Sequence, residues 1–146
     1  MVNVGDKPVT SRLATASASI HLTPETLQKI TEHQIGKGDV LGIARLAGIM
    51  ATKQTANLIP LCHPVRVDSV TVDFDIVGDG EISVRATVAA TDRTGVEMEA
   101  MTAVSIAALT VYDMCKSVDR SIRIDNLQLE LKSGGKSGNW QRSAAT

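Results

Sequence analysis

The stretch from Val96 to Val118 constrains the fold most, because its residues predict one long helix that is apolar on nearly every side. Acidic residues stand near its start and an aspartate–lysine pair near its end, with small, apolar or hydroxyl-bearing residues between them. Such a helix is normally buried, so the rest of the chain must supply a layer that covers it. Small residues along it would also let another helix approach closely, and we expect a homo-oligomer for this reason. These residues are Ala100, Ala103, Ala107 and Ala108.

Alternating apolar and polar residues indicate an antiparallel sheet beside this helix. The alternation predicts strands at 10–22, 70–76, 82–90 and 122–132. The last of these should place Leu127, Leu129 and Leu131 on one face. Two shorter helices are predicted at 24–33 and 40–57, with Thr23 and Asp39 as their N-caps. This order matches the split β-α-β pattern of an α+β, ferredoxin-like sandwich, in which helices cover one face of an antiparallel sheet.

Length and composition exclude several classes of protein. A chain of 146 residues suits a single domain over 1–146, with a flexible tail expected over 133–146. Three aromatic residues and no uniform basic patch speak against nucleic-acid binding. Two cysteines do not suggest a disulfide framework, which fits a cytoplasmic protein. The N-terminus lacks the apolar core of a signal peptide, and Ala100–Cys115 is shorter than the ~20 residues of a membrane span.

Asp113 and Lys116 are the first candidates for chemistry, because their spacing puts them on one face of the long helix. On an open surface they would form an ordinary ion pair worth about 0.2–0.5 kcal/mol. If they are buried, desolvation would shift both pKa values and prepare the pair for proton transfer. We expect a buried carboxylate–ammonium couple that self-association brings near the basic residues of a neighbouring chain.

Glu97 and Glu99 stand near the start of the same helix, where the helix dipole alone favours a carboxylate by about 0.3–1 kcal/mol. A helix rises about 1.5 Å per residue, so Glu99 and Asp113 lie about 21 Å apart along its axis. One small ligand does not normally span that distance. The two residues are therefore expected to serve different sites, or sites that are completed by different chains.

Cys62 and His63 lie in a short loop between two prolines, Pro60 and Pro64. His63 could carry protons near neutral pH, or it could be an ordinary polar loop residue. Structural zinc sites usually show paired ligands at short spacing, and no second pair is near, so no metal site is predicted. Cys62 could act as a nucleophile, although nothing nearby in the sequence identifies its base.

Two glycine-containing segments could bind an anion. The run Gly134-Gly135-Lys136-Ser137 ends like a P-loop but fails its spacing, because Glu130 stands where that motif needs glycine. The segment could still close its backbone N–H groups, with Lys132 and Lys136, on a phosphate, or it could be a frayed terminus. Lys37-Gly38-Asp39 is either a loop-to-helix junction that favours anions or a simple helix cap.

Six motifs occur together and in order. They are Lys37-Gly38-Asp39-Val40, Ala47-Gly48-Ile49-Met50-Ala51-Thr52-Lys53, Leu58-Ile59-Pro60-Leu61-Cys62-His63-Pro64, Thr94-Gly95-Val96-Glu97-Met98-Glu99-Ala100, Tyr112-Asp113-Met114-Cys115-Lys116 and Lys132-Ser133-Gly134-Gly135-Lys136-Ser137-Gly138. Over nearly the whole chain they closely resemble the cyclic pyranopterin monophosphate synthase family, also called molybdenum cofactor biosynthesis protein C. The resemblance implies a lyase that rearranges a cyclic dihydroguanosine triphosphate to cyclic pyranopterin monophosphate and releases diphosphate. It also implies a ferredoxin-like fold and a hexamer, a trimer of dimers, with sites between subunits.

The same resemblance assigns roles to residues. Asp113 would be the catalytic acid or base, with Lys116 as its partner and Lys37 beside them. Residues that would contact the substrate are Leu61, Cys62, His63, Met98 and Glu99. Lysines around the triphosphate would be Lys37, Lys132 and Lys136, joined by Glu97 and Arg12. No cofactor is required, although Mg²⁺ could accompany the triphosphate.

A second hypothesis is a catalytically inert protein that binds guanine nucleotides through the same lysines. Both hypotheses predict binding of a triphosphate. Only the lyase predicts release of diphosphate.

Overall fold

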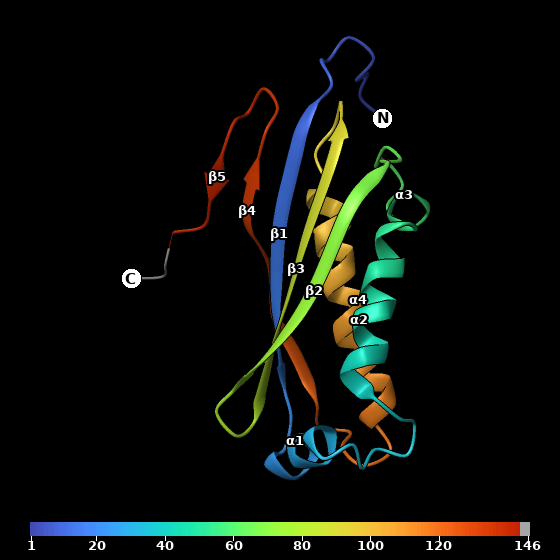
Figure 1. Ribbon diagram of the computed structural model, residues 1–146, viewed down its shortest axis with the longest axis vertical. Coiled ribbons are helices and arrows are strands. Elements are labelled where there is room, and N and C mark those ends of the chain that lie inside the picture. The colour runs from blue at the N-terminus through green and yellow to red at the C-terminus, as the bar shows by residue number, and fades with distance from the viewer. Residues whose placement is uncertain (144–146) are drawn as a thin grey trace.

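The computed structural model describes residues 1–143, which form one antiparallel sheet of five strands with four helices (Figure 1). The strands are β1 (Thr10–His21), β2 (Val67–Val77), β3 (Glu81–Asp92), β4 (Arg123–Ser133) and β5 (Trp140–Gln141). Their order across the sheet is β2-β3-β1-β4-β5. The helices are α1 (Pro24–Thr31), α2 (Val40–Thr52), α3 (Thr55–Leu58) and α4 (Glu97–Cys115).

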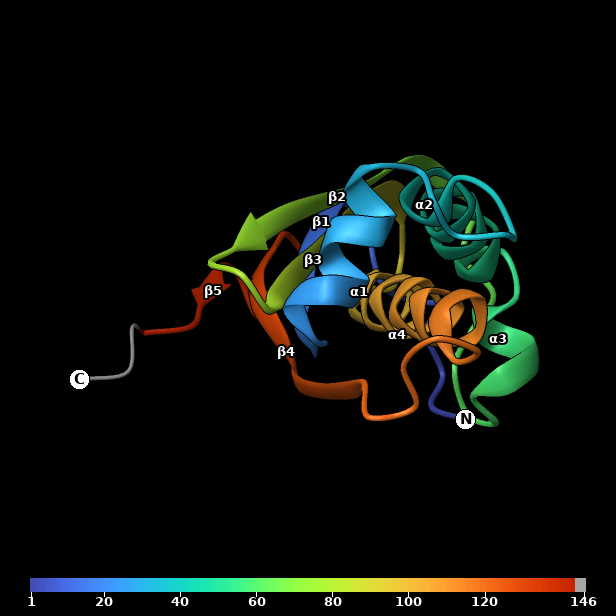
Figure 2. The same cartoon turned by 90° about the horizontal axis from the view of Figure 1, so that it is seen from below.

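The two longest helices, α2 and α4, lie side by side on the same side of the sheet, as Figure 2 shows. α1 lies at the end of the sheet where β1 finishes. Within residues 1–143, the other face of the sheet carries no helix. This arrangement confirms the predicted α+β, ferredoxin-like class.

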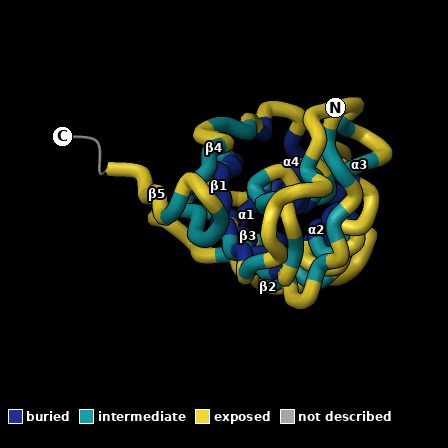
Figure 3. Tube along the Cα trace, turned by 90° about the horizontal axis from the view of Figure 1, so that it is seen from above, coloured by how far each residue is buried: buried dark blue, intermediate teal, exposed yellow. Residues whose placement is uncertain are grey.

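The core lies between the sheet and α4, where the buried residues gather in the interior (Figure 3). On β1 every second residue from Ala14 to Ile20 is buried, and α4 contributes Ala100, Ala103 and Ala107 to the same core. Because most of these side chains are small, the helix can approach the strands closely.

The helix ends follow their caps. The Thr23 hydroxyl accepts a hydrogen bond from the Thr26 N–H, and the Asp39 carboxylate accepts one from the Gly42 N–H, so both predicted N-caps are confirmed. The helix predicted to reach residue 57 divides, because the N–H groups of Lys53 and Gln54 bond to carbonyls three residues back instead of four. That tight turn separates α2 from α3.

The alanines of α4 have a partner within the same chain. A Cβ added at Gly48 of α2 would lie 2.9 Å from the Ala103 carbonyl oxygen and 3.2 Å from the Ala107 Cβ. The close helix approach that the sequence predicts is therefore real, and the helix that makes it is α2 of the same chain. The homo-oligomer stays a prediction, because this packing within one chain does not test it.

Strand β4 contains a bulge. Leu129 pairs with Ala16 whereas Leu131 pairs with Thr15, which lies on the opposite face of β1. The expectation that all three leucines share one face is wrong because the bulge reverses the alternation at Glu130. The Glu130 carboxylate instead accepts a hydrogen bond from the Ser17 hydroxyl on the open face.

The segment predicted as a flexible tail continues into the sheet over the part that the structure describes. After Ser133 the chain turns through Gly134 and Gly135, both with positive φ, and Trp140 of β5 pairs with Lys132 of β4. Residues 144–146 of the expected tail lie outside the described residues.

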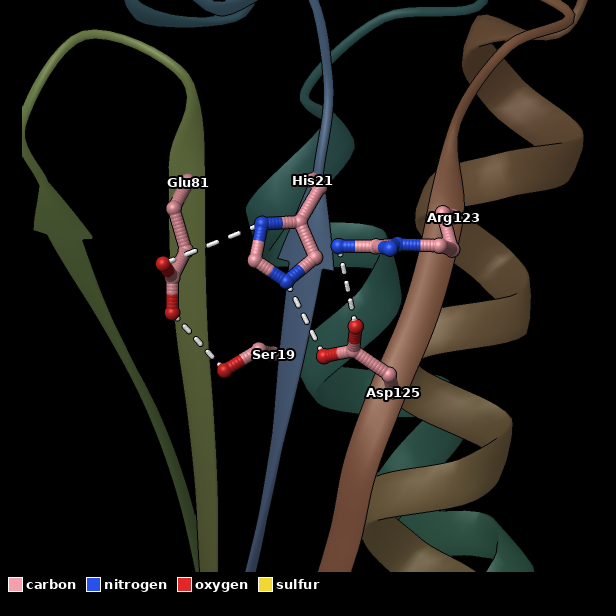
Figure 4. A network of polar contacts seen from close by, with 5 residues as sticks. All are labelled: Ser19, His21, Glu81, Arg123 and Asp125. Atoms are coloured by element: carbon pink, nitrogen blue, oxygen red, sulfur yellow. Dashed lines mark hydrogen bonds and ion pairs between the residues drawn. The ribbon is translucent and has the colours of Figure 1, made fainter.

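On the open face, a polar network joins the ends of β3, β1 and β4 (Figure 4). His21 Nε2 lies 2.9 Å from Asp125 Oδ1, and Arg123 Nη2 lies 3.1 Å from Asp125 Oδ2. The Ser19 hydroxyl donates to Glu81 over 2.7 Å. These contacts fix three neighbouring strands at the end of the sheet that lies next to α1.

By length and composition α4 is apolar enough to cross a membrane. In the fold it is a core helix, since its buried residues pack against the sheet and against α2. Its apolar character is therefore explained by tertiary packing.

Candidate functional site

The C-terminal end of α4 carries one carboxylate held between two lysines. Lys116 Nζ lies 2.6 Å from Asp113 Oδ1, and Lys37 Nζ lies 2.8 Å from Asp113 Oδ2. Lys37 also donates to the Asp113 backbone carbonyl over 3.0 Å, so it caps the end of the helix. The loop between α1 and α2 brings Lys37 there, next to Gly38, which has a φ of +101°.

The two ammonium groups fix the charge of Asp113. Hydrogen bonds from Lys116 and Lys37 lower the pKa of Asp113 to about 2, and the same contact with Asp113 raises the pKa of Lys116. At neutral pH the carboxylate is therefore ionised and Lys116 keeps its proton. One carboxylate thus lies within hydrogen-bond distance of two lysine side chains.

The exposure of this group differs from the sequence-based expectation. The side chains of Asp113, Lys116 and Lys37 are 55%, 53% and 49% exposed. The prediction of a buried couple is wrong for the single chain, because no other segment of residues 1–143 covers the end of α4 at this point. Any burial must come from a substrate or from another chain.

The N-terminal end of α4 carries a second group. Glu99 is only 2% exposed, and its Oε2 has no hydrogen-bond partner among residues 1–143. Burial raises its pKa, and the nearby charges of Glu97 and Asp92 raise it further. A buried, unpaired carboxyl oxygen of this kind can meet a polar atom of a ligand.

The loop after α3 lies against Glu99. Burial raises the pKa of the Cys62 thiol, and the charges of Glu99 and Glu97 add to the effect, which places Cys62 close to both acids. Leu61 and Met98 are exposed and His63 is half-buried. Cys62 and Glu99, from separate parts of the sequence, therefore lie within electrostatic reach of each other.

Beside Glu97, where one end of the sheet meets the start of α4, a cavity of about 400 Å³ is lined by five cationic side chains. We call it the cationic cavity. Its lining residues are Lys7, Arg12, Arg93, Thr94, Gly95, Glu97, Lys132, Lys136 and Ser137. Five positive charges against one carboxylate make it suited to a polyanion such as a polyphosphate.

Arg12 is fixed in the wall of this cavity. It is largely buried on β1, and its guanidinium donates to the backbone carbonyls of Asp92 and Arg93. The turn after β4 packs directly on it, since a Cβ added at Gly135 would overlap the Arg12 guanidinium. Lys132 contacts the Ser137 hydroxyl across the same turn, so the turn holds Lys136 at the cavity.

Sequence reasoning gave no role to two of the five cationic lining residues, Lys7 and Arg93. Neither lies within the six motifs that carry the resemblance. Strand register brings them to the cavity, because Thr10 pairs with Asp92 and so the segments before β1 and after β3 lie at the same end of the sheet.

The predicted site residues thus form two groups at opposite ends of α4. Lys37, Asp113 and Lys116 lie at one end, and the cationic cavity with Cys62 and Glu99 lies at the other. The rise of a helix separates Glu99 from Asp113 by about 21 Å. Residues 1–143 contain no cluster of three or more His, Cys, Asp or Glu side chains placed to hold a metal ion.

Fold and site together define a class: an α+β protein of ferredoxin-like architecture with a cavity lined by five cationic side chains and a carboxylate held between two lysines. Residues 1–135 match the MoaC family, and the chain belongs to that family. Among its relatives is the cyclic pyranopterin monophosphate synthase of Pelobacter propionicus, which is 56% identical over 143 residues, or 97% of this chain and 89% of the relative. The synthase of Desulfitobacterium hafniense is 51% identical over 142 residues, which cover 97% of this chain and 87% of the relative. The synthase of Thermomicrobium roseum is 54% identical over 143 residues, which cover 97% of this chain and 86% of the relative.

Proposed function

We propose that this chain is a cyclic pyranopterin monophosphate synthase, a lyase of molybdenum cofactor biosynthesis. It converts a cyclic dihydroguanosine triphosphate to cyclic pyranopterin monophosphate and diphosphate. Relatives named for this activity cover nearly the whole chain. The observation that carries the proposal is the cationic cavity, because a triphosphate is the part of this substrate that such a cavity recognises.

In this proposal the cationic cavity holds the triphosphate. Formation of the cyclic phosphate expels diphosphate, and the developing charge on that leaving group needs fixed positive charge. Arg12, Lys132 and Lys136 supply it, with Lys7 and Arg93 on the same walls. Any Mg²⁺ would arrive with the triphosphate, and the rearrangement requires no resident cofactor.

The proton transfers of the rearrangement fall to the group at the other end of α4. Lys37 and Lys116 donate and accept protons, while the ionised Asp113 holds both in place. Leu61, Cys62, His63, Met98 and Glu99 contact the ring system. A carboxyl group with a raised pKa, as Glu99 has, keeps its proton more readily and can donate a hydrogen bond to a ring nitrogen or carbonyl.

One substrate must meet both groups, although about 21 Å of helix separates them within one chain. We therefore propose a site shared by two chains, in which one chain supplies Lys37, Asp113 and Lys116 and its neighbour supplies the cationic cavity. In such a site the neighbouring chain would also exclude water from Lys37, Asp113 and Lys116, which are exposed in the single chain. We propose a homo-hexamer, assembled as a trimer of dimers, in the cytoplasm.

The test gives the purified protein the cyclic triphosphate and follows diphosphate release together with pterin fluorescence. A lyase releases one diphosphate for each pterin formed. A protein that only binds guanine nucleotides would bind the triphosphate and release none, and this result would refute the proposed function.

A further inference from the structure

Strand β5 closes the turn that borders the cationic cavity. The chain leaves β4 at Ser133 and returns at Trp140, which pairs with Lys132. This turn carries Lys136, one of the cations that line the cavity, and it lies at the end of the sheet where β1 begins (Figure 1). The position of Lys136 therefore depends on how firmly β5 is held against β4.

Backbone pairing alone holds β5 weakly. The strand consists of Trp140 and Gln141, and it adds two residue pairs at the edge of the sheet. Within residues 1–143, no residue after Leu129 belongs to the hydrophobic core. Because strands this short have little stability of their own, contacts of side chains must contribute to holding the turn closed.

Arg142 supplies such contacts on the return strand. Its backbone N–H donates to the Glu130 carbonyl over 2.8 Å, and its Nε donates to the Leu129 carbonyl over 2.9 Å. Its Cζ also lies 5.7 Å from the centroid of the Trp140 ring, within the range of a cation–π contact. Arg142 is thus fixed to β4 by two hydrogen bonds, and it holds the indole of Trp140 beside that strand.

Trp140 also lies next to a cation of the site. Residues directly opposite each other in an antiparallel pair have their side chains on the same face, so the indole stands beside the Lys132 side chain. The two residues line one cavity of about 300 Å³, and Lys132 lines the cationic cavity as well. Trp140 is 43% exposed, so its ring contributes little to the core.

We propose that Trp140 is a positioning residue for the polyanion: held by Arg142, it keeps Lys132 and Lys136 at the cationic cavity. It acts through these two lysines, because it is not among the described residues that line that cavity. The inference rests on the proposed function only in identifying the polyanion as the triphosphate of the substrate.

The test measures the Kd of inorganic triphosphate by calorimetry for the folded wild type, Trp140→Ala and Trp140→Phe. Neither substitution changes a charge. Trp140→Ala should raise Kd about tenfold, as loss of a charged contact would. Trp140→Phe should bind like the wild type, because a phenyl ring still attracts the guanidinium. Leu127→Ala, at an exposed leucine of β4, is the control and should leave Kd unchanged.

Two results of this comparison would overturn the proposal. One is a Trp140→Ala variant that binds inorganic triphosphate as tightly as the wild type. The other is a Trp140→Phe variant that binds as weakly as Trp140→Ala, since the indole N–H would then be a ligand of the anion.

A second measurement tests whether Trp140 acts through the two lysines. In a Lys132→Ala/Lys136→Ala background, Trp140→Ala should change Kd by less than about twofold, because residues that act as a unit are not additive. A further tenfold loss in that background would refute the positioning role.

Both measurements use binding without turnover, so they separate this inference from the proposed function. A wild type that binds inorganic triphosphate but releases no diphosphate from the cyclic triphosphate would refute the proposed function and leave the comparison of Kd values valid. A wild type that does not bind inorganic triphosphate would overturn the role given to Trp140.

Discussion

Lys37 Nζ lies 2.8 Å from Asp113 Oδ2, although 76 residues separate the two in the sequence. This contact, with the one from Lys116, holds the Asp113 carboxylate between two lysine side chains. In the proposed function the lysines transfer protons and Asp113 orients them.

Lys37→Ala should lower kcat by a factor of about 10²–10⁴, the usual contribution of a positioned proton donor. The measurement is steady-state diphosphate release at saturating substrate. Lys29→Ala is the control, because Lys29 pairs with Glu25 on α1 in a similar exposed ion pair and should leave kcat unchanged. Equal activity of the two variants would remove Lys37 from the proposed chemistry.

Gly135→Ala should weaken substrate binding, because its Cβ would displace the Arg12 guanidinium from the wall of the cationic cavity. Gly138→Ala is a matched control: both glycines have positive φ, +73° and +63°, but a Cβ at Gly138 meets nothing. Each substitution should cost about 1–2 kcal/mol of stability through backbone strain. Only Gly135→Ala should raise KM by about tenfold or more, as loss of a charged contact would. An equal KM for both variants would contradict the role given to Arg12.

Arg93→Ala and Lys7→Ala should each raise KM about tenfold, because each removes a charged partner of the triphosphate. Each substitution should weaken the binding of a ligand that carries only one phosphate by a smaller factor. Arg66→Ala, which removes an exposed arginine outside the cavity, should leave KM unchanged. If Arg93→Ala and Lys7→Ala raise the KM for the triphosphate no more than Arg66→Ala does, these two residues do not bind phosphate.

Asp119 should make the fold sensitive to acid. It accepts hydrogen bonds from the Thr23 N–H, the Ser121 N–H and the Ser121 hydroxyl. Burial raises its pKa, but these hydrogen bonds prevail and hold the pKa of Asp119 at about 2. Because the folded pKa lies below the unfolded value, the stabilisation is present above about pH 4 and is lost as pH falls toward 2.

Asp119→Asn should therefore lower the free energy of unfolding by about 2 kcal/mol at pH 7, and by progressively less between pH 4 and 2. Urea unfolding at several pH values measures the difference. Asp79→Asn, in the exposed turn between β2 and β3, should change little at any pH. A difference for Asp119→Asn that stays constant from pH 7 to pH 2.5 would contradict the assigned pKa.

The sequence was sufficient to predict the elements whose cause is local. Thr23 and Asp39 cap their helices through their own side chains, and the alternation of apolar and polar residues predicts the strands that form β2 and β3. The motifs also identified most of the residues that the structure gathers at the two ends of α4. Helix caps, strands and motifs depend on residues that are close together in the sequence, so the sequence alone predicts them.

Features that depend on distant contacts could not be predicted. Whether the Asp113 pair is buried depends on which segments pack over the end of α4, and none of residues 1–143 does. The alanines of α4 fit Gly48, a residue far away in the sequence, so their partner could not be identified from spacing. The bulge at Glu130 and the approach of Lys7 to Arg93 both follow from strand register, which a single sequence does not specify.

The most direct test of the central claim is the stoichiometry of diphosphate release from the cyclic triphosphate in a single turnover, for the wild type and for folded Lys116→Ala. We expect the wild type to release one diphosphate per substrate. We expect Lys116→Ala to bind the triphosphate with unchanged affinity yet to turn it over at least about 10² times more slowly. Full turnover by Lys116→Ala, or a wild type that binds the triphosphate without releasing diphosphate, would refute this mechanism.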